Sequence, residues 1–365
     1  MRNVIRYIIL IINLVFVALL LVSAGVRLFH NEPPWVFELV SLGYPYYVGV
    51  NCAFLLFWII MRKWWYVLVA LVAMVLSYSP FFDTFGFGSR REIQETDDSM
   101  TVLTYNINAF NYKGWRERAT VQTEFFDFIK QTQPDVLCLQ EFHYDKEEKY
   151  CLIDSLKSIG LKYKQAHKIH SIENRYFYGN VIFSRYPIVR HEALNFGKSG
   201  NSSHWVDIVR GADTLRIYNN HLESYRLQSE NFETIQQITS GQDFEVEDVK
   251  NVLQKMIYAM QKRNSQAIML RKSLQDCPYK MIVCGDFNAP AYSFIYHTIQ
   301  DAQNLRDAFI ETSKGIDGTF RWKFLSKRID FILVHPDFTP ASCTVYQKKI
   351  SDHFPVGAVV ICPTP

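Results

Sequence analysis

The chain has 365 residues, a formal net charge of +3 and seven cysteines. Its length allows one large domain or two ordinary ones. The net charge is close to zero and there is no long run of Lys or Arg, so the bulk charge does not support nucleic-acid binding. A nucleic-acid substrate stays possible, because a local basic groove can occur on a nearly neutral protein. The cysteines show none of the CxxC or Cys/His patterns of zinc sites, which leaves packing roles or a disulfide for them.

Three long apolar stretches stand at the start of the chain, at residues 7–26, 42–61 and 64–82. A helix needs about 20 residues to cross ~30 Å of hydrocarbon, and in a helix every backbone group is satisfied there. Buried core helices are the alternative, but three such stretches in a row are hard to hide in a soluble domain. We therefore predict a membrane anchor with three transmembrane helices over residues 1–82, with the lipid bilayer as its partner.

Basic residues near these stretches predict the orientation of the anchor, because Lys and Arg concentrate on the cytoplasmic side. Arg2 precedes the first stretch, and Arg62 and Lys63 join the second to the third. They favour a cytoplasmic N-terminus and an extracytoplasmic (periplasmic or extracellular) C-terminal domain, although Arg27 and the pair at residues 90–91 weaken this bias. Residues 83–100 carry Gly, Ser and charge, and we predict a linker there.

The rest of the chain, residues 101–365, mixes strand and helix patterns. Short apolar or alternating runs predict strands at residues 101–106, 135–140, 180–184, 215–220, 281–284, 329–334 and 356–361. Apolar residues at helical spacing predict helices at residues 120–131 and 247–274. Because several consecutive strands have no helix between them, a purely parallel sheet fits poorly. We predict an α/β (α+β) domain built as a two-layer β-sandwich flanked by helices.

Polar residues stand where these apolar strands end or begin, in a pattern that brings them to one rim of the sheets. They are Asn106, Glu141, His221, Asp286, Asn288, Asp330, Asp352 and His353. Their oxygens suit Mg²⁺ or Mn²⁺, a carboxylate can activate water, and a cationic His can stabilise a phosphoryl transition state. With no Ser or Cys nucleophile signature, direct attack of water on a phosphoester is the simplest chemistry. Taken singly, each residue also fits a structural role, such as a strand-end cap, an ion pair, a core histidine or an Asx turn.

Six segments that hold these residues follow in a recognisable order: TYNI, LQEF, NHLES, GDFNAP, RIDFIL and SDHFPV. Together they resemble the motifs of the endonuclease/exonuclease/phosphatase (DNase I-like) superfamily over residues 101–361. This superfamily includes DNase I-like nucleases, abasic-site endonucleases, inositol polyphosphate phosphatases, neutral sphingomyelinases and tyrosyl-DNA phosphodiesterases. The resemblance implies a DNase I-like sandwich over residues 101–365 and a metal-dependent hydrolase of phosphoester bonds, phosphodiesters in particular.

The resemblance implies that Asn106 and Glu141 belong to the motifs that hold the metal ion, Mg²⁺ or Mn²⁺, with Glu141 as the principal ligand. Asp352 matches a further carboxylate, either on the metal side or in acid/base chemistry.

The same resemblance implies that Asp286 positions or activates the attacking water and that Asn288 is its partner in the transition state. His353 resembles the His that contacts the phosphate, and Asp330 the carboxylate that orients it. His221 stands where nuclease-like and sphingomyelinase-like members have His. Abasic endonucleases tend to have Tyr there, so this position departs from their pattern.

Substrate identity is the least constrained feature of the sequence. Tyr178, Asn180 and Arg226 are candidates for substrate contact, with packing or a solvated surface as the alternative for each. The anchor favours a lipid head group or an extracytoplasmic phosphodiester over genomic DNA. An endonuclease or exonuclease acting on DNA or RNA is the alternative with the same chemistry, as is a sphingomyelinase-like lipid phosphodiesterase. A membrane-anchored binding protein without catalysis is the alternative of another class. No protein partner is evident from the sequence.

Overall fold

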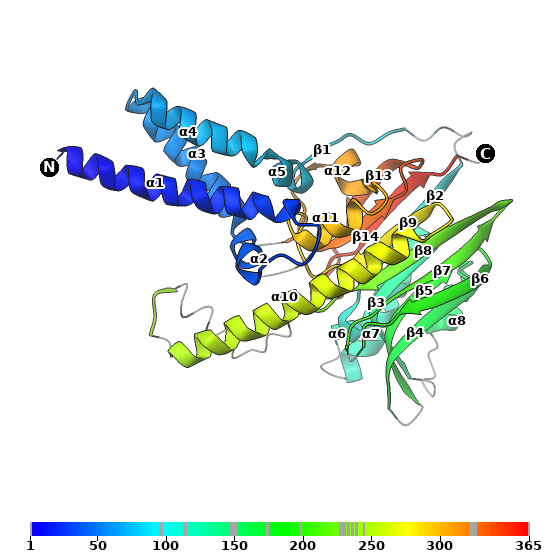
Figure 1. The fold of residues 1–365 in the computed structure, drawn as a ribbon. Coiled ribbons are helices and arrows are strands. Elements are labelled where there is room, and N and C mark those ends of the chain that lie inside the picture. Colours follow the sequence, from blue (N-terminus) through cyan, green and yellow to red (C-terminus); the bar gives the residue numbers. More distant parts are fainter. Residues whose placement is uncertain are drawn as a thin grey trace. The chain divides into compact units, whose positions relative to one another are not determined.

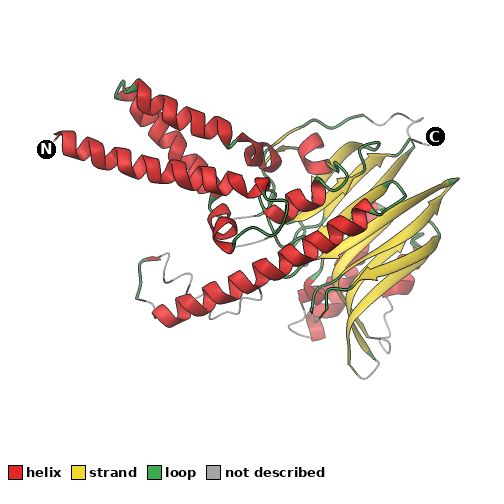
Figure 2. Ribbon diagram, viewed as in Figure 1, coloured by secondary structure: helices red, strands yellow, loops and turns green. Residues whose placement is uncertain are grey.

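Long apolar runs near the N-terminus form helices, whereas the later part of the chain combines strands with helices (Figures 1 and 2). The computed structural model describes residues 2–92, 94, 98–111, 115–145, 152–172, 175–197, 199–225, 231, 234, 237, 240–243, 245–320 and 327–363. Its helices are α1 (Arg2–Gly25), η1 (Val26–Leu28), α2 (Trp35–Ser41), α3 (Tyr44–Ile60), α4 (Trp64–Leu76), α5 (Tyr78–Thr84), α6 (Asn108–Asn111), α7 (Trp115–Thr132), α8 (Leu152–Ser158), α10 (Val246–Gln275), α11 (Phe294–Gln300) and α12 (Ala308–Thr312).

The strands form two six-stranded sheets and one two-stranded sheet. The first large sheet has the order β13-β14-β2-β3-β5-β4, with β2 (Ser99–Asn106), β3 (Val136–Asp145), β4 (Tyr163–Ile172), β5 (Tyr176–Ser184), β13 (Thr339–Val345) and β14 (Val356–Ile361). The second has the order β10-β12-β9-β8-β7-β6, with β6 (Ile188–Leu194), β7 (Ser203–Arg210), β8 (Asp213–His221), β9 (Met281–Asp286), β10 (Arg306–Asp307) and β12 (Asp330–Val334). Most neighbours are antiparallel, whereas β2–β3 and β8–β9 are parallel.

One apolar core joins the two large sheets. Val102 and Ile182 of the first sheet and Ile217 and Ile282 of the second are fully buried in the same cluster. A separate cluster lies on the outer face of the first sheet, where α7 contributes residues such as Phe125. Where helices cover a sheet, the sheet is therefore buried on both of its faces. The predicted two-layer sandwich flanked by helices is confirmed.

Part of the segment that we predicted as a linker is structured. Gly86 and Phe87 form β1 (Gly86–Phe87), which pairs with β11 (Lys314–Gly315). Farther along, the backbone N–H of Arg91 donates to the carbonyl oxygen of Ala341 at 2.8 Å. These backbone hydrogen bonds attach residues 86–91 to the strand-rich part of the chain.

The N-terminal helices carry a clear signal for a membrane span. Among the described residues, the helix over Val4–Leu28 is long and apolar enough to cross a membrane. The pairs α2 with α3 and α4 with α5 meet the same criterion only if each pair, bent by 60° and 54°, counts as one span. Of the three predicted spans, the described residues therefore show the first as one continuous helix, whereas the second and third fall on bent pairs and stay predictions.

Polar side chains join these helices to one another. The indole N–H of Trp58 in α3 donates to Asn13 Oδ1 in α1 at 2.9 Å, and the Asn51 amide donates to the carbonyl oxygen of Phe16 at 3.1 Å. The Tyr44 hydroxyl donates to the carbonyl oxygen of Ser77 at 2.7 Å. These hydrogen bonds give partners to polar groups that lie between apolar helices.

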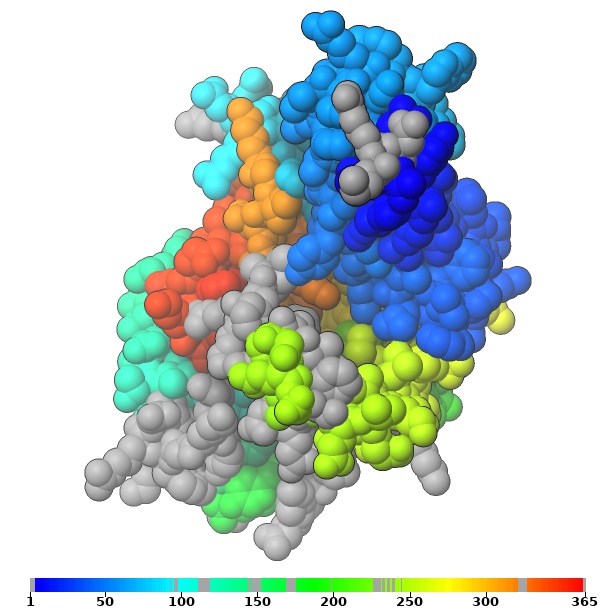
Figure 3. Space-filling model, turned by 90° about the vertical axis from the view of Figure 1, so that its left-hand side faces the viewer, coloured from blue at the N-terminus to red at the C-terminus, as the bar shows by residue number. Residues whose placement is uncertain are grey.

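The chain divides into two compact units that interleave along the sequence. One contains Met1–Thr84, Ser224–Ser265 and Ala291–His297, and the other contains the sandwich. Within the first unit, the Asn264 amide in α10 donates to the Glu38 carboxylate in α2, and the rings of Tyr44 and Tyr292 lie 5.7 Å apart. Figure 3 shows the blue N-terminal helices beside the yellow-green part of α10. Segments from the region predicted as catalytic, residues 101–365, therefore fold with the N-terminal helices.

A glycine in β9 allows this strand to approach β8 closely. Gly285 has a φ of +129°, and a Cβ at this position would lie 2.0 Å from the backbone oxygen of Asn220. We expect Gly285→Ala to destabilise the protein by on the order of 4 kcal/mol, because a backbone clash adds to conformational strain. Gly211→Ala is the matched control: its φ is +62° and the space around it is open. That variant should cost only about 1–2 kcal/mol, and equal melting temperatures for the two variants would contradict the expectation.

Candidate active site

The ends of four strands converge on one edge of the sandwich. Asn106 is the last residue of β2, and His221 and Asp286 are paired last residues of the parallel strands β8 and β9. Because β12 runs antiparallel to β9, its first residue, Asp330, lies opposite Asp286. The topology thus brings polar residues from both sheets together, although they are far apart in the chain.

Asp286 is the centre of this group and is almost fully buried. Its Oδ2 accepts hydrogen bonds from the amides of Asn106 at 3.0 Å and Asn288 at 3.3 Å, and its Oδ1 accepts from the backbone N–H of Asn288 at 2.8 Å. The Nε2 atoms of His221 and His353 lie 3.8 Å and 3.7 Å from Oδ2. One carboxylate therefore faces two amides and two imidazoles.

Glu141 reaches the site from a β-bulge in β3. The register of β3 against β5 shifts at this point, and Glu141 has a left-handed φ of 53°. Its Oε1 lies 3.3 Å from the Asn106 amide nitrogen and 3.5 Å from His221 Nε2. The side chain of Glu141 is 23% exposed, against 1% for Asp286. Of the two carboxylates, Glu141 is the one that a hydrated ion can approach.

His221 is held by a residue from the loop before β7. The amide nitrogen of Asn201 lies 2.9 Å from His221 Nε2 and also donates to the carbonyl oxygen of Leu222 at 3.0 Å. Both Asn201 and His221 are buried. This contact fixes the imidazole plane beside Glu141 and Asp286.

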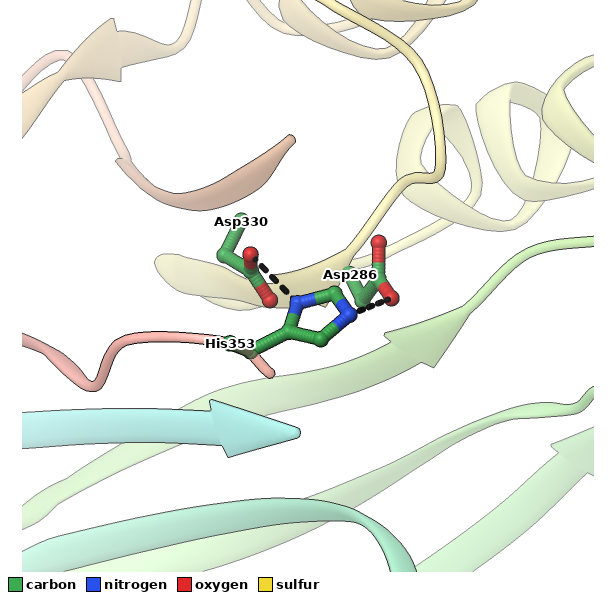
Figure 4. A group of neighbouring side chains, drawn as sticks. All are labelled: Asp286, Asp330 and His353. Carbon is green, nitrogen blue, oxygen red and sulfur yellow. Dashed lines mark hydrogen bonds and ion pairs between the residues drawn. The ribbon is translucent and has the colours of Figure 1, made fainter. Parts of the chain in front are cut away.

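His353 and Asp330 form a buried pair on the other side of Asp286 (Figure 4). His353 Nδ1 lies 2.9 Å from Asp330 Oδ2, and the Phe320 ring lies 4.9 Å from the imidazole. Burial by itself lowers the pKa of His353, but the Asp330 and Asp286 carboxylates raise it to about 10. Burial raises the pKa of Asp330 to about 6, against the opposing effect of His353. Near neutral pH the pair is an imidazolium with a carboxylate.

The structure joins most of the residues that the sequence singled out. Contacts of 3.8 Å or less connect Asn106, Glu141, His221, Asp286, Asn288, Asp330 and His353. Asp352 is exposed, and its Oδ1 accepts hydrogen bonds from Asn108 and Ser351, both at 3.0 Å. The chemical roles of these residues stay predictions.

The residues suggested for substrate contact have a different placement. The buried amide of Asn180 donates to the carbonyl oxygen of Ser202 at 2.9 Å, toward the second sheet. Tyr178 lies opposite His143 in the β3–β5 ladder and is partly buried. Arg226 lies outside the described residues. Substrate contact by any of the three stays a prediction.

Two neighbouring groups of side chains offer ligands for a divalent metal ion. The ligand atoms of Asp286, Asp330 and His353 all lie within 4.8 Å of one another. A protonated imidazole has no lone pair to offer, so His353 with its raised pKa already supplies the positive charge of this cluster. Glu141 offers a partly exposed carboxylate, and the buried Asn106 beside it offers an amide group. Their oxygens are hard ligands, which fit Mg²⁺ or Mn²⁺.

The sequence did not single out three residues that support the site. Asn201 contacts His221, Asn108 holds Asp352, and the Thr319 hydroxyl accepts the backbone N–H of Asp330 at 3.0 Å. Asn108 follows Asn106 by two residues, so the polar ending of that strand was a usable signal. Asn201 and Thr319 lie in segments with no strand pattern, and nothing local marks them.

Comparison with known proteins gives matches over both parts of the chain. The pattern of the Endonuclease/Exonuclease/phosphatase family matches residues 103–353, and a domain family of unknown function matches residues 6–84. The human Nocturnin catalytic domain with bound sulfate anion is 19% identical, with a TM-score of 0.51 over 74% of this chain and 97% of that one. D. rerio TDP2 complexed with single strand DNA product is 13% identical, with a TM-score of 0.50 over 72% and 99%. These two structures share the fold, and no curated protein sequence matches the chain.

Proposed function

The chain belongs to the endonuclease/exonuclease/phosphatase family, and on that premise we propose that it is a membrane-anchored hydrolase of phosphoester bonds, phosphodiesters in particular, that needs Mg²⁺ or Mn²⁺. The observation that carries the proposal is the convergence of two imidazoles and two amides on the buried carboxylate of Asp286. Such a group suits a reaction in which water attacks and charge develops on phosphoryl oxygens.

In this proposal Asp286 orients the attacking water and takes its proton, because its carboxylate is fixed by Asn106 and Asn288. His353, kept protonated by Asp330, presents Nε2–H to the phosphoryl oxygens and stabilises their negative charge. The side chains of Asn288 and His221 form hydrogen bonds beside the same reacting centre. Each group is already in place before substrate binds, so little reorganisation is needed.

Glu141 and Asn106 would hold the metal ion, with Asp352 as a further carboxylate on that side. When bound, the ion polarises a phosphoryl oxygen and neutralises charge on the substrate. Glu141 carries the negative charge for this task, since its carboxylate is the partly exposed one. The Asn106 amide also donates a hydrogen bond to Asp286, so Asn106 connects the proposed metal site with the carboxylate that would orient water.

Removal of the metal ion is expected to stop the reaction. The full-length chain in detergent should hydrolyse a generic phosphodiester with Mg²⁺ or Mn²⁺, lose this activity with EDTA, and regain it when the ion is restored. Glu141→Gln should lower kcat at limiting metal by at least about 10²-fold, whereas Glu192→Gln, an exposed Glu of β6, should leave it unchanged. Turnover that persists in EDTA would overturn the metal-dependent mechanism.

The substrate that we favour is a lipid head group, because the anchor keeps the chain at a bilayer. A nucleic acid is the second candidate, since TDP2, which shares the fold, was crystallised with a single strand DNA product. Sphingomyelin, phosphatidylinositol, inositol phosphates, DNA and RNA, offered to the full-length chain, separate these candidates by kcat/KM. A chain that turns over none of them and binds no metal would favour the binding protein without catalysis.

We also propose that the N-terminal helices cross the membrane three times, with the N-terminus in the cytoplasm and the sandwich outside. The long helix over Val4–Leu28 and the two bent pairs support three crossings, and Arg62 with Lys63 supports the orientation. A reporter fused to the C-terminus that is active only outside the cytoplasm should be active. Activity from a reporter that works only in the cytoplasm would reverse the orientation.

A further inference from the structure

The interior of the sandwich is polar one layer below the catalytic edge. Side chains on one face of a strand recur every second residue, so Thr104 lies one layer below Asn106, and Asn219 one layer below His221. Gln140 stands directly before Glu141. Thr104, Gln140 and Asn219 are all fully buried.

Asn219 uses its whole amide to bridge the two sheets. It lies in β8 of the second sheet, but its three side-chain hydrogen bonds all go to the first. Its Nδ2 donates to the carbonyl oxygens of Leu139 and Val181, both at 3.0 Å, and its Oδ1 accepts from Gln140 Nε2 at 2.7 Å. An asparagine amide has two N–H donors and one carbonyl acceptor, so both donors and the acceptor are engaged.

The two carbonyls that Asn219 binds mark the start of the bulge that presents Glu141. Leu139 and Val181 are the last paired residues before the register of β3 and β5 shifts. After them, two residues of β3, Gln140 and Glu141, lie opposite a single residue of β5. Glu141 has a left-handed φ of 53°. Such a conformation costs a non-glycine residue about 1–3 kcal/mol, and it persists only where surrounding contacts hold it.

The network continues from Gln140 to the neighbouring strand. Besides bonding Asn219, the Gln140 amide donates to Thr104 Oγ1 at 3.0 Å. Asn219, Gln140 and Thr104 thus connect β8, β3 and β2, the three strands that carry His221, Glu141 and Asn106. A buried carbonyl that loses its donor costs about 1–3 kcal/mol, so the bulge would relax if Asn219 were shortened.

We infer that Asn219 is a positioning residue that holds the bulge in β3 and thereby aims the Glu141 carboxylate at the metal ion. The inference rests on the proposed function, because it assigns Glu141 to metal binding. Loss of a residue that orients a metal ligand without touching the ion typically lowers metal affinity or activity by about 10–100-fold. Asn219 acts through Glu141 and touches no reacting atom.

The test compares Asn219→Ala with Asn220→Ala in the full-length chain. Asn220 is the matched control: it is the next residue, equally buried, and its amide also donates to a backbone carbonyl, that of Cys284 at 2.8 Å, but on the other face of β8. Mn²⁺ affinity is read from the electron paramagnetic resonance signal of the free ion, with the melting temperature and the separate values of kcat and KM measured in parallel.

Asn219→Ala should raise the Kd for Mn²⁺ by about 10–100-fold and lower kcat with little change in KM. Asn220→Ala should lower the melting temperature by a similar amount, with a Kd within about threefold of the original. If Asn219→Ala does not fold, Thr104→Val, which removes only the far end of the network, should still raise the Kd several-fold. An unchanged Kd in a folded Asn219 or Thr104 variant overturns the inference, whereas an original chain that binds no Mn²⁺ overturns the proposed function itself.

Discussion

Replacing Asp286 with alanine should lower kcat on a phosphodiester by about 10²–10⁴-fold, the usual contribution of a group that moves a proton in the transition state. The size of this effect follows from its position: Asn106, Asn288, His221 and His353 all face this one carboxylate. Its loss removes the proposed proton acceptor and also leaves the imidazolium of His353 with Asp330 as its remaining close carboxylate. Initial rates at saturating substrate and Mn²⁺ measure the loss.

Two further variants separate proton transfer from structure. Asp286→Asn keeps the size of the side chain and an oxygen for the backbone N–H of Asn288, yet cannot take a proton, so it should lose nearly as much activity as the alanine variant. Asp337→Ala removes an exposed carboxylate of the second unit, 58% exposed, and should leave kcat unchanged. A kcat for Asp286→Asn close to that of the original chain would exclude Asp286 as the proton acceptor.

The central strands of the sandwich were readable from the sequence because they are buried on both faces. The strand predicted at residues 356–361 coincides with β14, and those at 101–106 and 281–284 lie within β2 and β9. The strands that the sequence did not reveal include β4, β6 and β13, each of which lies at the edge of a sheet. Edge strands carry charged and polar residues, as in IVRHEAL of β6, and so lack an apolar pattern.

The composition of the site was readable for a related reason. A polar residue that follows an apolar strand is conspicuous, and Asn106, His221 and Asp286 were found in this way. Asn201 and Asn219 were not, because their importance lies in contacts with residues that are far away in the chain. Strand alternation places Asn219 inside the sandwich, but the carbonyls that it binds belong to the opposite sheet, whose register no local pattern specifies.

The interleaving of the two units was equally hidden from the sequence. Glu38 lies among the apolar residues of α2, between the first two predicted spans, and Asn264 lies in a long amphipathic helix. Neither pattern indicates the other residue as its partner. A polar residue within an apolar stretch indicates only that a partner exists. The partner itself follows from the fold, which brings Ser224–Ser265 to the N-terminal helices.

Substitution of Asp330 by asparagine is expected to move the alkaline limb of the kcat profile to lower pH. Asp330 is the carboxylate nearest to His353, at 2.9 Å, and contributes the largest of the effects that raise the His353 pKa to about 10. Without that charge, burial again lowers the pKa, so the imidazolium loses its proton earlier as the pH rises. We expect a shift of at least about one pH unit, which corresponds to about 1.4 kcal/mol. Asp352→Asn, at an exposed and more weakly acting carboxylate, should shift the limb less.

The same pair links pH to stability in a defined direction. The pKa of His353 is 6.5 in its ordinary state and about 10 in the folded protein, so the folded state binds the extra proton between these values. The stabilisation is therefore complete below about pH 6.5 and is lost as the pH rises toward 10. Melting temperatures across this range should fall more steeply for the original chain than for Asp330→Asn. Parallel curves would mean that His353 is not protonated in the folded protein, and its proposed role as a cation at the phosphoryl group would fail with them.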